Sequence, residues 1–232
     1  MEQNMDLKIK IFADGADSKG MLEMNANPLI KGLTTNPTLM RIAGITDYLS
    51  FAKEILTHIK EKPISFEVFA DENDEMERQA NILGALGRNV NIKIPITNTQ
   101  GVSTKPLVKK LANAGVKLNI TAMMTIAQVK HIAPTLSEGP GGYVSVFAGR
   151  IADTGVDPVP IMSEIVEYLE RFPNIELIWA SPREVLNVVQ ANDIGCHVIT
   201  VTNDLIKKFS NLKKDLDLIF NYYLYVVSWW KI

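Results

Sequence analysis

The chain has 232 residues, of which 47% are apolar and 22% are charged, a composition typical of globular proteins that argues against disorder. Its formal net charge of −2, with no basic block, argues against nucleic acid as a partner. The single cysteine, Cys196, fits a reducing compartment, and no segment resembles a membrane-spanning helix or a signal peptide, so we expect a cytoplasmic protein without membrane contact.

Short runs rich in β-branched residues recur along the chain, with helix-like stretches between them. In chain order, the runs are 8–14, 31–36, 64–70, 90–97, 116–122, 143–150, 175–180 and 196–202. Two of the intervening segments, 71–87 and 156–172, show the 3.6-residue periodicity of helices. The first of these has Asp71 as a candidate N-cap and ends at Gly87.

This alternation predicts parallel strands that are joined by right-handed helical crossovers. A count near eight favours a closed (β/α)₈ TIM barrel over an open doubly wound sheet, and no G-x-G-x-x-G fingerprint follows the first run. We therefore predict one barrel domain over residues 1–232, with an irregular aromatic tail from about residue 210.

In a barrel strand, alternate residues face the lumen and the surrounding helices. Apolar residues fill the positions of one parity, which we expect to face the helices: Ile9, Ile11, Ala13, Phe66, Val68, Ile92, Ile94, Ile96, Leu118, Ile120, Ala122, Val144, Val146 and Ala148. The lumen then receives Asp14, Ser65, Glu67, Asn91, Lys93, Asn119, Thr121, Ser145 and Phe147. A packed barrel core is normally less polar, and barrel enzymes place their chemistry at the C-terminal ends of the strands.

Lys93 lies in the middle of VNIKIPIT, a run otherwise suited to burial. An enclosed lysine approaches neutrality, and a neutral amine attacks a carbonyl to form a Schiff base. Asp14 and Glu67 are inward carboxylates that could move protons, and Thr121 could hold a water molecule. Two alternatives stay open: a lysine on an edge strand that faces water, and a structural Lys93–Glu67 ion pair in the lumen.

The later runs suggest a phosphate site. Arg150 ends the sixth run, and Ser181 precedes a predicted helix over 182–192 in which Pro182 takes the first position. A helix N-terminus together with Arg150 and Arg183 would bind phosphate. The alternative for either arginine alone is a surface salt bridge.

Several segments together resemble the transaldolases, in the compact subgroup that also contains the fructose-6-phosphate aldolases. The segments are FAD, GLTTNPTL, NIKIPIT, LNITAMMT, SVFAGRIAD and ASPRE, which occur in the expected order from the first run to Val201. The resemblance implies that Lys93 forms the Schiff base, that Asp14 transfers a proton, and that Thr121 holds the catalytic water with Glu67. It also implies a set of substrate-binding residues: Thr35, Asn36, Asn119, Ser145, Phe147, Arg150, Ser181 and Arg183.

Two positions bear on the reaction type. The compact aldolases usually carry glutamine and tyrosine where this chain has Glu67 and Phe147, the pair found in transaldolases. The resemblance therefore implies transfer of a dihydroxyacetone unit between sugar phosphates, as in the non-oxidative pentose phosphate pathway. Pro182 departs from the family, which usually has phenylalanine there.

Aldolase-type cleavage, transaldolase chemistry on an unusual sugar phosphate, and a non-catalytic sugar-phosphate-binding barrel are alternative functions. No cofactor is implied, and no His/Cys/Asp cluster has metal-ligand spacing. The aromatic C-terminal end would suit a contact in a homo-oligomer, or it could be a poorly folded tail.

Overall fold

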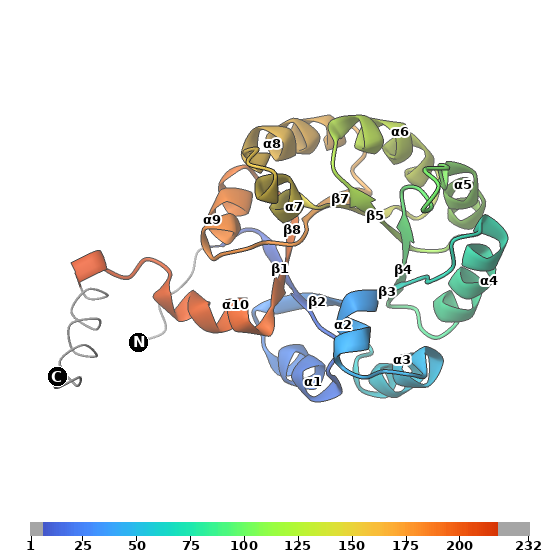
Figure 1. Cartoon of the computed structure of the whole chain (residues 1–232), viewed down its shortest axis with the longest axis horizontal. Helices are drawn as coiled ribbons and strands as arrows, with labels where there is room; N and C mark the ends of the chain where they lie inside the picture. The colour runs from blue at the N-terminus through green and yellow to red at the C-terminus, as the bar shows by residue number, and fades with distance from the viewer. Residues whose placement is uncertain (1–6, 218–232) are drawn as a thin grey trace.

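A computed structural model of the chain describes residues 7–217 and contains a closed barrel of eight parallel strands (Figure 1). The strands are β1 (Lys10–Asp14), β2 (Ile30–Thr34), β3 (Ile64–Glu67), β4 (Val90–Pro95), β5 (Leu118–Met123), β6 (Gly142–Val146), β7 (Ile175–Trp179) and β8 (Val198–Thr202). Each predicted run overlaps one strand, and the predicted TIM barrel is confirmed. The single domain with an aromatic tail stays a prediction, and residues 218–232 of that tail lie outside the described part of the chain.

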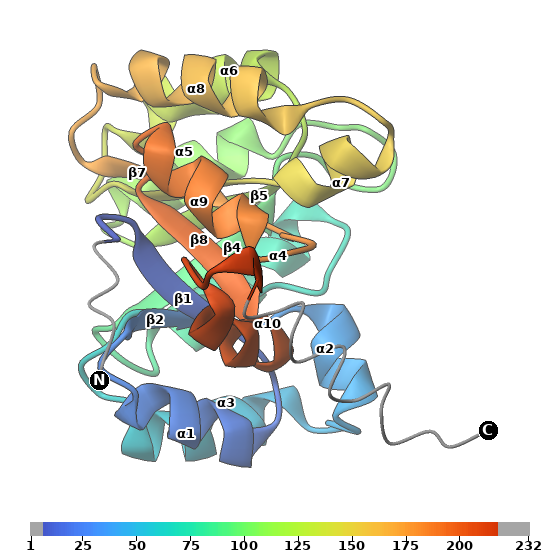
Figure 2. The ribbon, with the colours of Figure 1, turned by 90° about the vertical axis from the view of Figure 1, so that its left-hand side faces the viewer.

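The helices form a ring around the barrel. They are α1 (Ser18–Ala26), α2 (Pro37–Ile42), α3 (Tyr48–His58), α4 (Asn73–Gly84), α5 (Lys105–Asn113), α6 (Ile126–Leu136), α7 (Ala148–Asp153), α8 (Pro158–Leu169), α9 (Leu186–Asp193) and α10 (Asn203–Lys207), followed by a 3₁₀ turn, η1 (Lys208–Asn211). Figure 1 shows the short helices α2 and α7 nearer the barrel axis than α3 and α8. Figure 2 shows α2 and α7 at the same end of the barrel, toward which the strands run. These two helices therefore bring their residues to the C-terminal mouth.

Side-chain caps fix where several helices begin. Asp17, Asn36 and Asp47 accept hydrogen bonds from backbone N–H groups in the first turns of α1, α2 and α3. The predicted cap Asp71 is wrong, because α4 begins at Asn73 and the Asp71 carboxylate instead accepts two hydrogen bonds from Thr99, each 2.7 Å long. No helix within residues 7–217 has the length and apolar character to cross a membrane.

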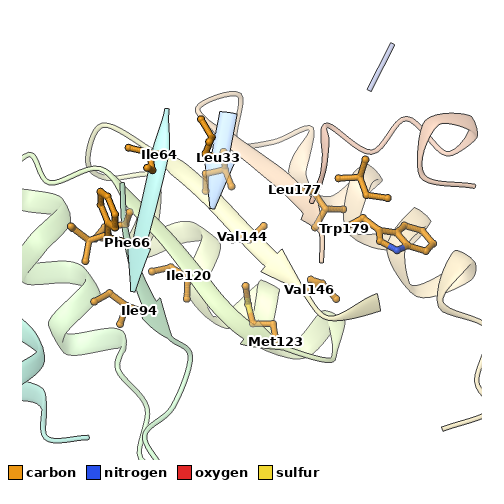
Figure 3. Close-up of a cluster of buried hydrophobic side chains, with 14 of the residues drawn as sticks. Leu33, Ile64, Phe66, Ile94, Ile120, Met123, Val144, Val146, Leu177 and Trp179 are labelled. Carbon is orange, nitrogen blue, oxygen red and sulfur yellow. The ribbon is translucent and has the colours of Figure 1, made fainter. Parts of the chain in front are cut away.

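Apolar side chains pack on both faces of the strands. The larger cluster lies between strands and helices; Figure 3 shows alternate residues of β6, Val144 and Val146, pointing into it. A smaller cluster fills the lumen around Phe12, which makes an edge-to-face contact with Tyr143 at 5.6 Å between ring centroids. A Cβ at Gly32 would come within 2.5 Å of the Phe12 ring, so this wide side chain fits only beside a glycine. Residues of the two parities therefore lie on opposite faces of the strands, as predicted for most positions, and apolar side chains fill the part of the lumen around Phe12.

One position departs from that pattern. The pairing of β5 with β6 shifts between Ile120 and Met123, and Ala122 has a φ of 61°. This irregularity puts Met123 into the buried helix-facing cluster, whereas Ala122 lines the central cavity. The prediction that Ala122 faces the helices is wrong, because a bulge reverses the parity that a regular strand would keep.

Candidate active site

A cavity of about 440 Å³ lies at the C-terminal mouth of the barrel. Its lining includes every predicted site residue except Thr35: Asp14, Asn36, Glu67, Lys93, Asn119, Thr121, Ser145, Phe147, Arg150, Ser181 and Arg183. It also includes residues that we did not predict, among them Thr34, Thr38, Ala122, Thr200 and Thr202. The structure thus brings together side chains from all eight strands or the segments that follow them.

Lys93 lies on β4, directly across from Glu67 at the end of β3. Its Nζ is 3.0 Å from Glu67 Oε2 and donates a hydrogen bond of 3.0 Å to the backbone oxygen of Thr35. The interpretation of Lys93 as an edge-strand lysine is wrong, because the barrel is closed and the residue is only 8% exposed. The alternative of a lumen ion pair with Glu67 describes the observed contact.

The Asp14 carboxylate, at the end of β1, is held by two residues from β2 and its C-terminal end. It accepts a hydrogen bond of 2.8 Å from Thr34 Oγ1 and one of 3.3 Å from Asn36 Nδ2. Asn36 is fixed in turn, because its side-chain oxygen caps α2 by accepting the Leu39 N–H at 2.9 Å. Burial raises the pKa of Asp14, although the Lys93 charge and the two hydrogen bonds oppose this shift. A carboxyl group with a raised pKa is suited to proton transfer near neutral pH.

Three buried polar residues form a chain across the lumen. Ser145 Oγ donates to Asn119 Oδ1 at 2.7 Å, and Asn119 Nδ2 donates to Ser65 Oγ at 3.1 Å. Because β3 carries Ser65, β5 carries Asn119 and β6 carries Ser145, the orientation of this amide is set by the barrel itself. Such a fixed arrangement can distinguish hydroxyl positions on a bound molecule.

Thr121 Oγ1 is buried and has no hydrogen-bond partner among the residues that the structure describes. Buried hydroxyl groups are normally satisfied by protein or by ordered water. The hydroxyl lies in the lining of the cavity that also contains Lys93 and Glu67. This geometry suits the predicted role of Thr121 in holding a water molecule, which stays a prediction.

The two arginines reach the cavity from irregular or short segments. Arg150 lies on α7, four residues after the end of β6, with its guanidinium 4.8 Å from the centre of the Phe147 ring. Arg183 lies in the loop after β7, where its Nε donates to Asp153 Oδ1 at 2.9 Å. The alternative of a surface salt bridge therefore applies to Arg183, which is about half exposed at 47%.

The predicted helix start at Ser181 is wrong. α9 begins only at Leu186, and Ser181 has a left-handed φ of 59° that turns the chain before any helix forms. Instead of a helical turn, the side-chain oxygen of Asn187 accepts the backbone N–H groups of Arg183 at 2.7 Å and Glu184 at 3.1 Å. The predicted phosphate site therefore has no helix N-terminus at Ser181, but the two guanidinium groups, of Arg150 and Arg183, do line the cavity.

Tyr48, which does not line the cavity but contacts a residue that does, and Thr200 were both missed from the sequence. Tyr48, at the start of α3, donates from its hydroxyl to the backbone oxygen of Glu67 at 3.0 Å, and burial raises its pKa. No motif marks Tyr48. Thr200 is buried and lines the cavity from β8, and the alternation in that strand could have identified it. Within residues 7–217, no three His, Cys, Asp or Glu side chains gather closely enough to hold a metal ion.

Comparison with known proteins identifies relatives over most of the chain. Residues 11–221 match the sequence model of the family described as Transaldolase/Fructose-6-phosphate aldolase. A protein of Thermoanaerobacter sp. (strain X514), named "Probable transaldolase", is 36% identical over 194 residues, which are 83% of this chain and 85% of that protein. A protein of the same name from Methanococcus maripaludis (strain C5 / ATCC BAA-1333) is 32% identical over 204 residues, 88% of this chain and 90% of that protein.

A solved structure shares the fold at low sequence identity. Dihydrodipicolinate synthase from Rhodopseudomonas palustris superimposes with a TM-score of 0.60 at 13% identity, covering 96% of this chain and 84% of that one. This likeness concerns the barrel alone, whereas the sequence relatives and the family match confirm the resemblance seen in the motifs. The chain belongs to the transaldolase/fructose-6-phosphate aldolase family.

Proposed function

We propose that this protein is a transaldolase that moves a dihydroxyacetone unit from a ketose phosphate to an aldose phosphate through a Schiff base on Lys93. The observation that carries the proposal is one cavity that contains an enclosed lysine, two carboxylates and two arginines. A binding protein for sugar phosphates would need the arginines but not Lys93 with Asp14 and Glu67. Membership of the transaldolase/fructose-6-phosphate aldolase family supports the same Schiff-base chemistry at Lys93.

The first step is formation of the imine. The neutral amine of Lys93 attacks the ketose carbonyl, and the resulting carbinolamine loses water. Glu67 lies 3.0 Å from Nζ and can accept the ammonium proton. A water molecule held by Thr121 and Glu67 then relays that proton to the departing hydroxyl group. The backbone oxygen of Thr35, which accepts a hydrogen bond from Nζ, orients the amine.

Cleavage of the carbon–carbon bond follows. Asp14 removes the proton from the hydroxyl on the carbon that becomes the aldehyde of the leaving aldose, and the electrons of the breaking carbon–carbon bond move to the protonated imine. An aldose phosphate leaves, and the three-carbon unit stays on Lys93 as an enamine. An acceptor aldose phosphate then takes this unit by the reverse steps, with Asp14 returning its proton, and water hydrolyses the new imine to free the amine.

The remaining residues orient the substrate. Asn36, Asn119 and Ser145 have side chains fixed by hydrogen bonds and suit recognition of sugar hydroxyl groups. Phe147 forms an apolar wall, and Arg150 with Ser181 and Arg183 binds the terminal phosphate. The combination of Glu67 and Phe147 favours transfer over simple aldol cleavage. We extend the proposal to a place in the non-oxidative pentose phosphate pathway and a cytoplasmic location. We also propose a homo-oligomeric state, and light scattering of the full chain would test that state.

Borohydride trapping tests the proposal most directly. The protein is incubated with fructose 6-phosphate and sodium borohydride, digested, and analysed by mass spectrometry, with Lys109→Met as a surface control. We expect one reductively modified peptide that contains Lys93. Modification of a different peptide would contradict the assignment of the nucleophile.

Turnover with and without an aldose phosphate acceptor separates the candidate reactions. A transaldolase needs the acceptor, whereas acceptor-independent turnover at a comparable rate would identify an aldolase that releases dihydroxyacetone. Thermal stabilisation by fructose 6-phosphate without turnover or trapping, in folded protein, would identify a binding barrel.

A further inference from the structure

Arg183 is held at its backbone and at its guanidinium, although it lies in an irregular loop. Asn187 accepts its backbone N–H at 2.7 Å. The Asp153 carboxylate accepts the Nε–H at 2.9 Å and a second hydrogen bond from Nη2. A guanidinium bound side-on in this way keeps the donors of its other edge free, because its N–H groups form a rigid planar fork.

The helix that carries Asp153 packs directly against the loop that carries Arg183. Gly149 on α7 donates its backbone N–H to Ala180 at 3.3 Å. A Cβ at Gly149 would come within 1.6 Å of the Ser181 backbone oxygen and 3.5 Å of Arg183 Nε. Only a glycine allows this close approach, which puts Asp153 within reach of the Arg183 side chain.

Asp153 and Arg150 lie three residues apart on α7 but differ in position relative to the cavity. Arg150 and Arg183 line the cavity, whereas Asp153 does not. Asp153 stays ionised at neutral pH, because its hydrogen bonds from Arg183 lower its pKa. The Asp153 carboxylate thus contacts one edge of the Arg183 guanidinium from outside the cavity lining.

We propose that Asp153 is a positioning residue, which holds the Arg183 guanidinium so that its free edge binds the terminal phosphate of the substrate. This inference rests on the proposed function, because it names a further residue of the same phosphate site. If Asp153 acts in this way, the preference of the protein for phosphorylated over unphosphorylated substrates depends in part on Asp153, which lies outside the cavity lining.

Two opposing effects decide the sign of the expected change. Holding an arginine side chain before the substrate arrives removes its ordering from the free energy of binding. The negative charge of Asp153 repels a phosphate, but the charge is paired with Arg183, and the two side chains are 52% and 47% exposed, so water screens the repulsion. We therefore expect the positioning effect to exceed the repulsion.

The first experiment compares Asp153→Ala and Asp153→Asn with wild type. For Asp153→Ala we expect the KM for fructose 6-phosphate to rise about three- to tenfold, as the loss of one preordered side chain predicts, with kcat within about twofold. Asp153→Asn, which keeps the shape and one acceptor oxygen, should show a smaller rise. The rate of borohydride trapping with unphosphorylated dihydroxyacetone should not change in either variant.

A matched control comes from another ion pair. Lys130 and Glu164 are 3.0 Å apart and 47% and 53% exposed, nearly the same exposures as Arg183 and Asp153, but neither lines the cavity. Glu164→Ala should leave the KM for fructose 6-phosphate unchanged. If this control raised the KM equally, a general loss of stability would explain the result and the proposal would fall.

A double-mutant cycle gives the sharpest test. If Asp153 acts only through Arg183, then Asp153→Ala should have no further effect on the KM in an Arg183→Ala background. A lower KM for Asp153→Asn, an unchanged KM for Asp153→Ala, or an equal loss of dihydroxyacetone trapping would overturn the positioning role.

Failure of the proposed function gives a different pattern. Wild-type protein would then show no trapping at Lys93, or Arg183→Ala would not change the KM for fructose 6-phosphate, and both proposals would fall together. A wild type that traps at Lys93 and depends on Arg183, with Asp153 variants that behave like wild type, would overturn this inference alone.

Discussion

At one end of the cavity, Lys93 and Glu67 lie on adjacent strands, whereas at the other end Arg183 lies in a loop and pairs with Asp153 on a short helix. The side chains of the first pair are 10% and 17% exposed, and those of the second are 47% and 52% exposed. Strand register fixes the first pair in an enclosed lumen, where an unpaired charge is costly. Side-chain hydrogen bonds fix the second in contact with water, where an ion pair adds little stability. The first region therefore suits the proposed chemistry on a carbonyl group, and the second suits the proposed binding of a phosphate that arrives from solvent.

Replacing the nucleophile should produce the largest effect. Lys93→Met should abolish imine trapping and lower turnover by several orders of magnitude, because no other lysine among residues 7–217 lines the cavity. The fold should persist, since the cavity opens to water that can screen Asp14 and Glu67. Steady-state assays and circular dichroism test both points. Turnover within about tenfold of wild type, roughly 1.4 kcal/mol of activation free energy, would make Lys93 a structural residue.

Asp14→Asn should separate activity from stability at the same end. Loss of the proton-transfer group should lower kcat by about 10²- to 10⁴-fold. Burial raises the pKa of Asp14, so its contribution to stability is full below the ordinary aspartate pKa and is lost as pH rises through the raised value. Asparagine does not titrate, and the variant should therefore be more stable than wild type at pH 7. Urea unfolding should show that this advantage shrinks as pH falls toward about 4. A variant less stable than wild type at pH 7 would contradict the burial argument.

Thr121→Val should lower kcat without lowering stability. The Oγ1 atom has no protein partner among residues 7–217, so replacing it by a methyl group of similar shape breaks no hydrogen bond within the described protein. Loss of the held water should lower kcat by about 100-fold, at the low end for proton transfer by a positioned group. Thr121→Ser restores the hydroxyl group and should recover most of the rate. A large loss of stability in Thr121→Val would instead indicate a structural hydroxyl group.

Arg150→Ala probes the phosphate end and should affect binding more than chemistry. Loss of a charge-assisted contact should raise the KM for fructose 6-phosphate by about 10- to 100-fold. Trapping with dihydroxyacetone, which has no phosphate, should change little. Arg150→Lys keeps the charge but not the planar fork or the stacking on Phe147, and should fall between the two. An equal effect on both substrates would remove Arg150 from the phosphate site.

The difference between the two regions also explains what could be predicted from the sequence. Alternation along regular strands placed Lys93, Glu67 and Asn119 in the lumen, because register in a closed barrel leaves each side chain one direction. The start of α9 was mispredicted because Ser181 takes a left-handed conformation and Asn187 binds the N–H groups that a helical turn would present. Capping propensity at Ser181 carries no information about either event.

Other features depend on contacts between distant segments. Tyr48 reaches Glu67 from a helix that begins 19 residues earlier, and Asp153 reaches Arg183 across 30 residues. Both contacts follow from packing of helices at the mouth of the barrel and not from a local pattern. The family motifs pointed to Arg183, and the segment SVFAGRIAD ends at Asp153, but nothing in either segment indicates that the two residues pair.

A substitution at the bulge residue Ala122 should give the smallest effect. Ala122 has a φ of 61°, a conformation that is unfavourable for residues with a Cβ, and it lies next to Thr121 in the cavity lining. Ala122→Gly should raise the free energy of unfolding by about 0.5–1 kcal/mol, because glycine adopts this φ freely. Ala133→Gly, within α6, should lower it by about 1 kcal/mol. Urea denaturation of both variants compares the signs. A glycine that destabilises position 122 would show that the bulge is held by the strands around it and not strained by its alanine.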